Sequence, residues 1–393
     1  MRKILIIGAS VLQLPAILKA KEMGFYVGVV DYNPQAIGIK HADVFFNVST
    51  IDTEGILETA KSFQPEGIMT LATDMPMRSI AAVTRKLNLP GISMESAVKA
   101  TDKGEMIQAF KEYGVDVPWF FIVKNQDELE AVSEKITYPC IVKPVDNAGS
   151  RGVILINEQP ELKDAYKYSK EHSQNGAVII EEYMTGNEVS VEAMAVNGEI
   201  HILAITDKIT TGPPHFVEMG HSQPSQLPET VQQKVKTLTV KAMQALGINN
   251  GPAHVEIMVT PNGPKMIELG ARMGGDNITT HLVPLSTGID MVKATIELAV
   301  GEIPDLTPKI SRGSAIRYMK VQPGIIQKIT GMEEAEKIAG VKEIVFTKSV
   351  GETATQIQSS TDRVGYVVVQ SSNSENSITI CELAKNKISI VTV

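Results

Sequence analysis

The chain is poor in cysteine and has no long apolar run, and each deficit excludes a class of protein. Its two cysteines, Cys140 and Cys381, lie far apart, which argues against a disulfide framework or a cysteine-rich metal site and is typical of a reducing compartment. The apolar start at Ile4–Ile7 is interrupted by Gly8 and Gln13, and no later stretch is long enough to span a bilayer. We therefore expect a cytoplasmic protein without a membrane partner.

Positive charge is also scarce. The net charge is −8 and no run of lysine or arginine appears, so the basic surface that binding of a phosphate backbone requires is missing. We expect no nucleic-acid partner. With 43% hydrophobic and 21% charged residues over 393 positions, the composition is that of an ordinary globular enzyme of two or three domains.

The first hundred residues predict strands that alternate with helices. Short apolar segments at Lys3–Ile7, Tyr26–Val30, Gly67–Thr70 and Leu89–Gly91 are candidate strands, and a helical pattern runs from the first of them to about Met23. Strands separated by helices imply an α/β fold with a doubly wound, parallel sheet.

A nicotinamide-binding domain is one alternative for this region, because Asp31 follows Gly8 by about twenty residues, where an acidic ribose contact falls. The glycines that let a backbone approach a pyrophosphate are missing after Gly8. This absence weakens an oxidoreductase function and favours a scaffold of the same topology.

The rest of the chain predicts a mixed architecture. Helices are expected at Met94–Tyr113 and Glu229–Leu246, alternating strands and helices at Phe120–Ala195, and a long loop at Thr210–Pro228. After Pro304 the sequence reads as a β-rich tail.

Two glutamates mark the most informative segment. In a hairpin centred on Asn262, Glu256 and Glu268 are directly opposite each other on one face, with Cβ atoms about 5 Å apart. The other face of that hairpin pairs Val255 and Ile257 with Leu269 and Ile267. Opposed carboxylates repel unless a cation lies between them, and Mg²⁺ prefers carboxylate and phosphate oxygens. The alternative is an edge hairpin whose glutamates face water; Arg272, four residues on, favours a phosphoryl-transfer site because it can clamp an anion.

Two further segments suit a nucleotide. Lys143 precedes a Gly/Ser loop that runs from Asn147 to Gly152 through Gly149 and Ser150, and backbone amides of such a loop can hold phosphates. It is not a P-loop, because no Gly-Lys-Ser/Thr opens a helix. An extended segment then carries the residues that could meet an adenosine, namely Glu181, Glu182, Met184 and Glu188. Taken alone, each segment is more often an ordinary hairpin, and it is their coincidence with the paired glutamates that favours a nucleotide site.

In this order and spacing, with Thr101-Asp102-Lys103 upstream, the segments resemble the ATP-grasp superfamily over essentially the whole chain. The resemblance implies a pre-grasp α/β domain at 1–95, a two-lobed ATP-grasp module at 96–305 with a mobile lid lobe at about 115–185, and a β-rich C-terminal domain at 306–393.

The same resemblance implies the roles of individual residues. Lys103, Lys143 and the Asn147–Gly152 loop would contact ATP phosphates, and Glu181, Glu182 and Met184 would line adenine. Glu188 would bind the ribose, and Glu256 and Glu268 would hold Mg²⁺, with Mn²⁺ as a substitute. Many members have Asn two residues after the second metal glutamate; this chain has Gly270, which leaves the third ligand open.

Within the superfamily, two segments look like the L-amino acid ligase group, which joins amino acids into dipeptides. They are Glu268–Asp276 and His215–Pro224. The likeness implies that Glu218 and His221 lie near substrate or metal, although His221 could equally satisfy a local carbonyl. It also implies that Arg272 stabilises the acyl phosphate and that Asp276 lies in a substrate pocket, where a cationic group is conceivable.

The resulting prediction is an ATP-dependent carboxylate–amine ligase that works through an acyl phosphate on small-molecule substrates, with a homodimer as an open alternative to a monomer. Alternatives are a purine-pathway enzyme that activates formate, a carbamoyl-phosphate-type enzyme, or a nucleotide-binding regulatory protein without catalysis. A regulatory protein has no need for the paired glutamates, Arg272 and two lysines.

Overall fold

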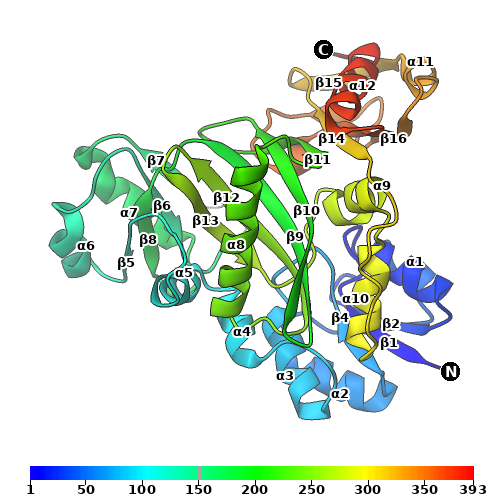
Figure 1. The fold of residues 1–393 in the computed structure, drawn as a ribbon, viewed down its shortest axis with the longest axis horizontal. Helices are drawn as coiled ribbons and strands as arrows, with labels where there is room; N and C mark the ends of the chain where they lie inside the picture. The colour runs from blue at the N-terminus through cyan, green and yellow to red at the C-terminus, as the bar shows by residue number, and fades with distance from the viewer. Residues whose placement is uncertain (148–151) are drawn as a thin grey trace.

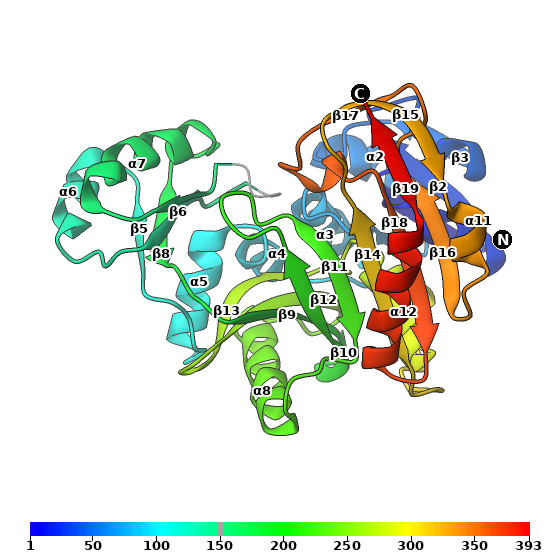
Figure 2. The same ribbon diagram turned by 90° about the horizontal axis from the view of Figure 1, so that it is seen from above.

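The computed structural model describes residues 1–147 and 152–393, and the strands of these ranges form four sheets (Figures 1 and 2). The first sheet is parallel, in the order β3-β2-β1-β4. Its apolar strands β1 and β2 are almost completely buried, as expected for a sheet covered on both faces. Its elements are β1 Lys3–Ile7, α1 Leu14–Glu22, β2 Tyr26–Asp31, η1 Ile39–His41, β3 Val44–Asn47, α2 Thr53–Phe63, β4 Gly67–Met69 and α3 Met77–Leu87.

The parallel sheet confirms the predicted α/β class, but its fourth strand is not the predicted one. Leu89–Gly91 forms no strand and leads instead into the next helix, since Pro90 has no amide hydrogen to donate to a ladder. The fourth strand is β3, Val44–Asn47, which pairs with β2 at the opposite edge.

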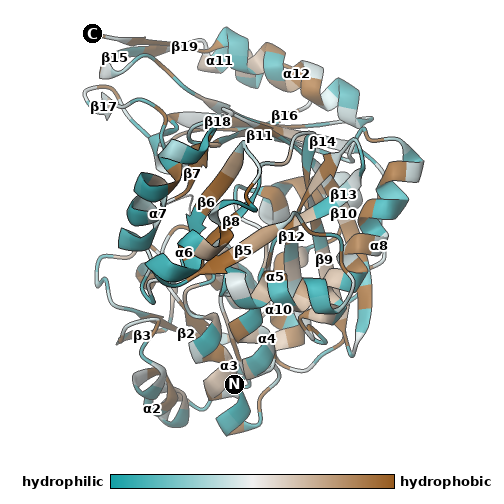
Figure 3. Cartoon of the chain, turned by 90° about the vertical axis from the view of Figure 1, so that its left-hand side faces the viewer, coloured by the Kyte–Doolittle hydropathy of each residue, from teal (hydrophilic) through white to brown (hydrophobic). Residues whose placement is uncertain are grey.

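A second, four-stranded sheet builds a separate lobe, with the order β5-β8-β6-β7. The lobe has its own apolar core, which includes Val142, Ile156 and Ile180. Its strands are largely apolar and its helices mostly hydrophilic (Figure 3). Its elements are β5 Phe120–Val123, α6 Gln126–Ser133, β6 Cys140–Pro144, β7 Ile154–Ile156, η2 Gln159–Glu161, α7 Leu162–Glu171 and β8 Val178–Glu182.

The largest sheet is antiparallel, in the order β13-β12-β9-β10-β11-β14-β18-β16, and it continues from the middle of the chain into its last third (Figure 2). Its strands are β9 Asn187–Val196, β10 Glu199–Thr210, β11 Glu218–Gln223, β12 Gly251–Thr260, β13 Gly263–Gly270, β14 Gly313–Met319, β16 Val341–Phe346 and β18 Gly365–Ser371. Strand β11 lies inside Thr210–Pro228, so the prediction of a loop throughout that segment was wrong. Pairing with β10 on one side and β14 on the other holds β11 in place despite its weak strand propensity.

The C-terminal part contains helices as well as strands. A small sheet has the order β17-β15-β19, and α12 packs on β14 and β18 of the large sheet. The elements are β15 Gly324–Thr330, α11 Met332–Glu336, β17 Thr353–Ala354, η4 Ser360–Asp362, α12 Ser374–Lys387 and β19 Ser389–Thr392. The tail is therefore less purely β than its turn signals indicated.

The remaining helices connect these sheets. Helix α10 returns to the first sheet, where it packs against α1 and β4 (Figure 1). The elements are α4 Met94–Lys99, α5 Lys103–Glu112, α8 Glu229–Ala245, the π-helical turn η3 Ile278–Leu282, α9 Val283–Thr287 and α10 Met291–Ala299. None of the helices in the described ranges combines the length and apolar character that a bilayer crossing requires.

Candidate active site

The hairpin of β12 and β13 places the two predicted glutamates in register. Glu256 pairs directly with Glu268, and their side chains are 24% and 29% exposed, so both reach the surface of the sheet. Val255 pairs with Leu269 as expected. A bulge just beyond Glu256 then shifts the register, so Ile257 faces Met266 and the predicted partner Ile267 is wrong.

Glu256 also contacts a buried ion pair, formed by His254 and Glu192. His254 Nδ1 lies 2.6 Å from Glu192 Oε1, and its Nε2 lies 3.4 Å from Glu256 Oε1. Burial lowers the pKa of His254, but the charge of Glu192 and the hydrogen bonds to Glu192 and Glu256 together outweigh burial and raise the pKa to about 9. Because Glu192 is fully buried, the pair fixes the imidazole beneath the first predicted metal ligand.

Two lysines neutralise the opposed glutamates. Lys103 Nζ lies 2.9 Å from Glu268 Oε2, and Lys208 Nζ lies 3.0 Å from Glu256 Oε1. Lys103 is the first residue of α5, whose N-cap Asp102 accepts hydrogen bonds from the amides of Gly104 and Glu105. The predicted single helix at Met94–Tyr113 is therefore two helices, and the break between them orients Lys103.

Lys208 is a site residue that sequence reasoning missed. It pairs with Glu188 and Glu256 and lies 3.7 Å from Glu218, with its side chain only 3% exposed. Burial lowers its pKa, but the charges of Glu256, Glu188 and Glu218 and the hydrogen bond to Glu188 together outweigh burial and raise the pKa, so the amine stays charged. A lysine in Ile200–Ile209, a stretch of mixed apolar and polar residues typical of a strand, was the available signal, since buried lysines are almost always paired.

A cavity of about 640 Å³ opens beside Lys208, between the segment after β8 and the β10–β11 connection. Met184 and Glu188, both predicted to meet the nucleoside, line this cavity together with Lys208. Phe216 and Met258 supply apolar surface to it. A flat aromatic base with a polar sugar would match this combination of walls.

In the smaller lobe, the side chains predicted to bind ATP already have partners within the protein. Lys143 on β6 and Glu181 on β8 form an ion pair with both side chains 9% exposed, and Glu182 Oε2 lies 2.7 Å from Lys265 Nζ. Asn147 donates from Nδ2 to the His172 carbonyl at 3.0 Å, and its own carbonyl accepts from Lys103.

Of the predicted phosphate loop, the structure describes the two ends, Asn147 and Gly152. Gly152 has φ +80, and a Cβ there would lie 2.6 Å from His172 Cβ, so the loop ends at a position that favours glycine. Gly149 and Ser150 lie outside the described residues.

Arg272 is engaged by the first domain. Its Nε and Nη2 donate to Asp74 Oδ1 and Oδ2, each at 3.1 Å. A Cβ on Gly270 would lie 2.9 Å from Arg272 Cζ and 3.0 Å from Asp74 Oδ1, so this ion pair fills the space of the missing Asn side chain. Asp74 was not predicted, because only the fold brings residue 74 to residue 272.

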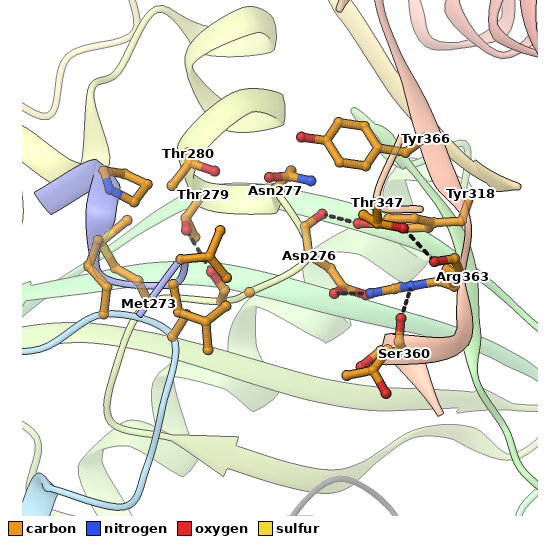
Figure 4. A pocket seen from close by; sticks show the side chains of 18 of the residues that line it. Met273, Asp276, Asn277, Thr279, Thr280, Tyr318, Thr347, Ser360, Arg363 and Tyr366 are labelled. Carbon is orange, nitrogen blue, oxygen red and sulfur yellow. Dashed lines mark hydrogen bonds and ion pairs between the residues drawn. The ribbon is translucent and has the colours of Figure 1, made fainter. Parts of the chain in front are cut away.

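A second cavity, of about 380 Å³, lies where the first domain meets the C-terminal part; we call it the Asp276 cavity (Figure 4). Leu12, Met273, Asp276, Tyr318 and Arg363 are among the residues that line it. Arg363 Nη1 and Nη2 donate to Asp276 Oδ2 and Oδ1 at 2.7 and 2.8 Å. The cation that the sequence allowed beside Asp276 is thus an arginine of the chain itself.

His221 lies at the back of the same region. It is 1% exposed, and its Nε2 is 3.5 Å from Asp276 Oδ2. Neither ring nitrogen makes a hydrogen bond within the described part of the chain, so the alternative role, a bond to a local carbonyl, is not found there. Glu218 contacts a lining residue of each cavity, because its carboxylate faces Lys208 while its carbonyl accepts from Arg363.

The fold therefore gathers Lys103, Glu188, Glu218, Glu256 and Glu268 around one centre, with Arg272 beside it. Asp276 lines the neighbouring cavity and His221 is buried beside it, whereas Lys143 and Glu181 lie on the smaller lobe. Within residues 1–147 and 152–393, no three His, Cys, Asp or Glu side chains are arranged to bind a metal. Two opposed carboxylates, 24% and 29% exposed, nevertheless suit a divalent cation that takes its other ligands from phosphate and water.

Comparison with known families gives two matches. The ATP-grasp domain family matches residues 136–281, which include Lys143, Lys208, Glu256 and Glu268. The L-amino acid ligase C-terminal domain 2 family matches residues 317–393, which include Arg363.

Curated relatives and solved structures agree with these matches. The chain is 28% identical to alanine–anticapsin ligase of Bacillus subtilis (strain 168) over 76% of this chain and 67% of the relative. It is 27% identical to an L-arginine-specific L-amino acid ligase of Bacillus subtilis over 69% of this chain and 67% of the relative. The fold matches the L-amino acid ligase of Bacillus licheniformis with a TM-score of 0.86 and 23% identity, over 100% and 99% of the two chains.

Proposed function

Because the chain carries an ATP-grasp domain followed by an L-amino acid ligase C-terminal domain, we propose that it is an ATP-dependent ligase that joins the carboxylate of one amino acid to the amine of another. One observation carries the proposal: Glu256 and Glu268 are directly opposed beside Lys103, Lys208 and Arg272. Such a cluster can hold a polyphosphate with its metal and the charge that develops during phosphoryl transfer.

ATP would enter the cavity lined by Met184 and Glu188, with its phosphates directed at Lys103, Lys208 and the glutamate pair. Mg²⁺, or Mn²⁺ in its place, would be held by Glu256 and Glu268 and would neutralise phosphate charge. Lys103 and Lys208, which neutralise the glutamates in this structure, would then be released to phosphate oxygens.

The reaction needs little more than positioning. A substrate carboxylate oxygen attacks the γ-phosphorus in line, the bond from phosphorus to the β–γ bridging oxygen breaks, and ADP leaves. Arg272, held by Asp74 in this structure, exchanges that partner for the acyl phosphate. A neutral amine then attacks the acyl carbon, phosphate departs, and the amine loses a proton as the amide forms.

Two kinds of alternative remain, another ATP-dependent ligase and a protein without catalysis. A ligase that activates formate or makes carbamoyl phosphate would use the same phosphate-binding residues with a smaller acid. A regulatory nucleotide-binding protein would not need Arg272 or the opposed glutamates. The free, buried Cys140 and Cys381 support our proposal that the enzyme works in a reducing cytoplasm.

The test is phosphate release from Mg-ATP across a matrix of paired amino acids. We expect release with particular pairs, together with a product of dipeptide mass. Glu268→Gln should abolish release while the fold is retained, because the opposed carboxylate that we assign to the metal is lost. Glu199→Gln, an exposed change on β10 of the same sheet, is the matched control.

Each contrary outcome removes a different part of the proposal. Full turnover in Glu268→Gln would contradict the metal assignment. If the wild type releases no phosphate with any pair in the matrix, the assignment of amino acid substrates is wrong. Formate and bicarbonate would then be tested as substrates.

A further inference from the structure

The Asp276 cavity contains a carboxylate that is already neutralised. Arg363 binds Asp276 through two parallel hydrogen bonds, the fork geometry in which arginine and carboxylate match best (Figure 4). Two further donors are also used: Nε donates to the Ser360 carbonyl at 2.8 Å and Nη1 to the Glu218 carbonyl at 3.0 Å. Arg363 is therefore fixed in place and is not a side chain that a ligand readily displaces.

Packing holds both partners in position. The Arg363 guanidinium lies 3.7 Å from the centre of the Tyr318 ring, and the Tyr318 hydroxyl donates to the Asp276 carbonyl at 2.8 Å. Asp276 itself has positive φ, a backbone conformation that tertiary contacts must maintain. The aromatic ring thus connects the arginine and the backbone of the aspartate into one rigid unit.

The rest of the cavity carries no formal charge. Among the described residues that line it, Asp276 and Arg363 are the only aspartate, glutamate, lysine or arginine. Leu12, Pro15 and Met273 contribute apolar surface, and Thr280 contributes a neutral hydroxyl. With one negative and one positive charge paired, the cavity presents a net charge of zero to a ligand.

We propose that Arg363 determines the substrate specificity of the ligase, because it cancels the charge of Asp276 and restricts the cavity to amino acid side chains without charge. The inference rests on the proposed function, since it takes the Asp276 cavity as the place of a substrate side chain. A cationic side chain would have to compete with Arg363 for Asp276, and an anionic one with Asp276 for Arg363; either would leave an unpaired charge in a largely buried place. The cavity volume of about 380 Å³ lies in the range of small-molecule sites.

The experiment changes the charge of the cavity in single steps. Arg363→Gln leaves a net charge of −1, Asp276→Asn leaves +1, and the double variant Asp276→Asn/Arg363→Gln returns to zero. Each protein is assayed for ATP-dependent ligation with two pairs of similarly shaped amino acids, lysine against norleucine and glutamate against glutamine. The readout is the ratio of kcat/KM within each pair, so a general loss of activity cancels.

We expect the wild type and the double variant to prefer norleucine and glutamine. Arg363→Gln should raise the lysine-to-norleucine ratio about tenfold or more, and Asp276→Asn should raise the glutamate-to-glutamine ratio similarly. The double variant is the control for folding, because it retains neither buried charge.

The outcomes separate this inference from the proposed function. Ratios that stay constant across all four proteins would show a purely structural ion pair, and a wild type that prefers lysine or glutamate would also overturn the inference. A wild type that ligates no amino acid at all would instead overturn the proposed function.

Discussion

Lys208 shows how one buried side chain decides the electrostatics of the site. Glu188, Glu218 and Glu256 lie on three different strands, and Lys208 faces all of them. At Glu188, burial and the charges of Glu256 and Glu218 together raise the pKa more than Lys208 lowers it. At Glu256, by contrast, Lys208 and His254 outweigh burial and lower the pKa. The amine thus keeps a cluster of acids stable in this structure, and under the proposed function phosphate oxygens would take the place of these acids as its partners.

Removal of this amine should be costly. We expect Lys208→Met to reduce the free energy of unfolding by about 3–5 kcal/mol at neutral pH, because three carboxylates lose a buried partner. Lys236→Met, on the surface of α8, should change it by less than about 0.5 kcal/mol. Denaturant titration of both variants is the measurement. A small effect at Lys208, equal to that of the control, would contradict the assigned pairing.

At the scale of elements, α5 is the helix that aims a cation at the site. Its N-cap Asp102 accepts two backbone hydrogen bonds, and the helix begins with Lys103, whose amine reaches Glu268. The break between α4 and α5 therefore has a functional consequence, since a continuous helix would point residue 103 along a different face.

Loss of this cap should affect both stability and nucleotide binding. Asp102→Ala is expected to reduce the free energy of unfolding by about 0.5–2 kcal/mol. It should also raise the KM for ATP severalfold, because the first turn of α5 no longer holds Lys103 in position. The control is Asp52→Ala, which removes the N-cap of α2, where the Asp52 side chain accepts a hydrogen bond from the Gly55 amide. It should reduce the free energy of unfolding by a similar amount and leave the KM for ATP unchanged. Equal KM values for the two variants would refute the positioning role of α5.

The whole molecule is united by the large sheet. Strands β9 to β13 carry the acidic centre, and β14 and β18 of the same sheet bring Tyr318 and Tyr366 to the Asp276 cavity. Contacts between distant segments complete the site: Asp74 reaches Arg272, and Arg363 reaches Asp276. Each cavity therefore depends on the docking of parts that are far apart in sequence.

The cysteines report on the integrity of two of these parts. Cys140 lies in the core of the smaller lobe and Cys381 in that of the C-terminal part, and burial raises the pKa of both thiols to about 12. At pH 8 only about one thiol in ten thousand is ionised, so we expect no reaction with a thiol reagent in the native state and reaction of both in denaturant. Raising the pH increases the thiolate fraction, so any native labelling should grow with pH. Rapid labelling of Cys140 at pH 8 would contradict the burial described for it.

The sequence by itself determined the α/β class, the parallel first sheet and the facing of Glu256 and Glu268, because these follow from local periodicity and from a short hairpin. Its likeness to ATP-grasp enzymes also pointed to the ligase chemistry. The sequence did not show that Thr210–Pro228 contains a strand, since the neighbours β10 and β14 hold β11 in place. Nor did it show Lys208 among three glutamates, Asp74 on Arg272 or Arg363 on Asp276. Those pairs join residues as many as 198 positions apart, and only the packing of the sheets brings such residues within the few ångströms over which an ion pair acts.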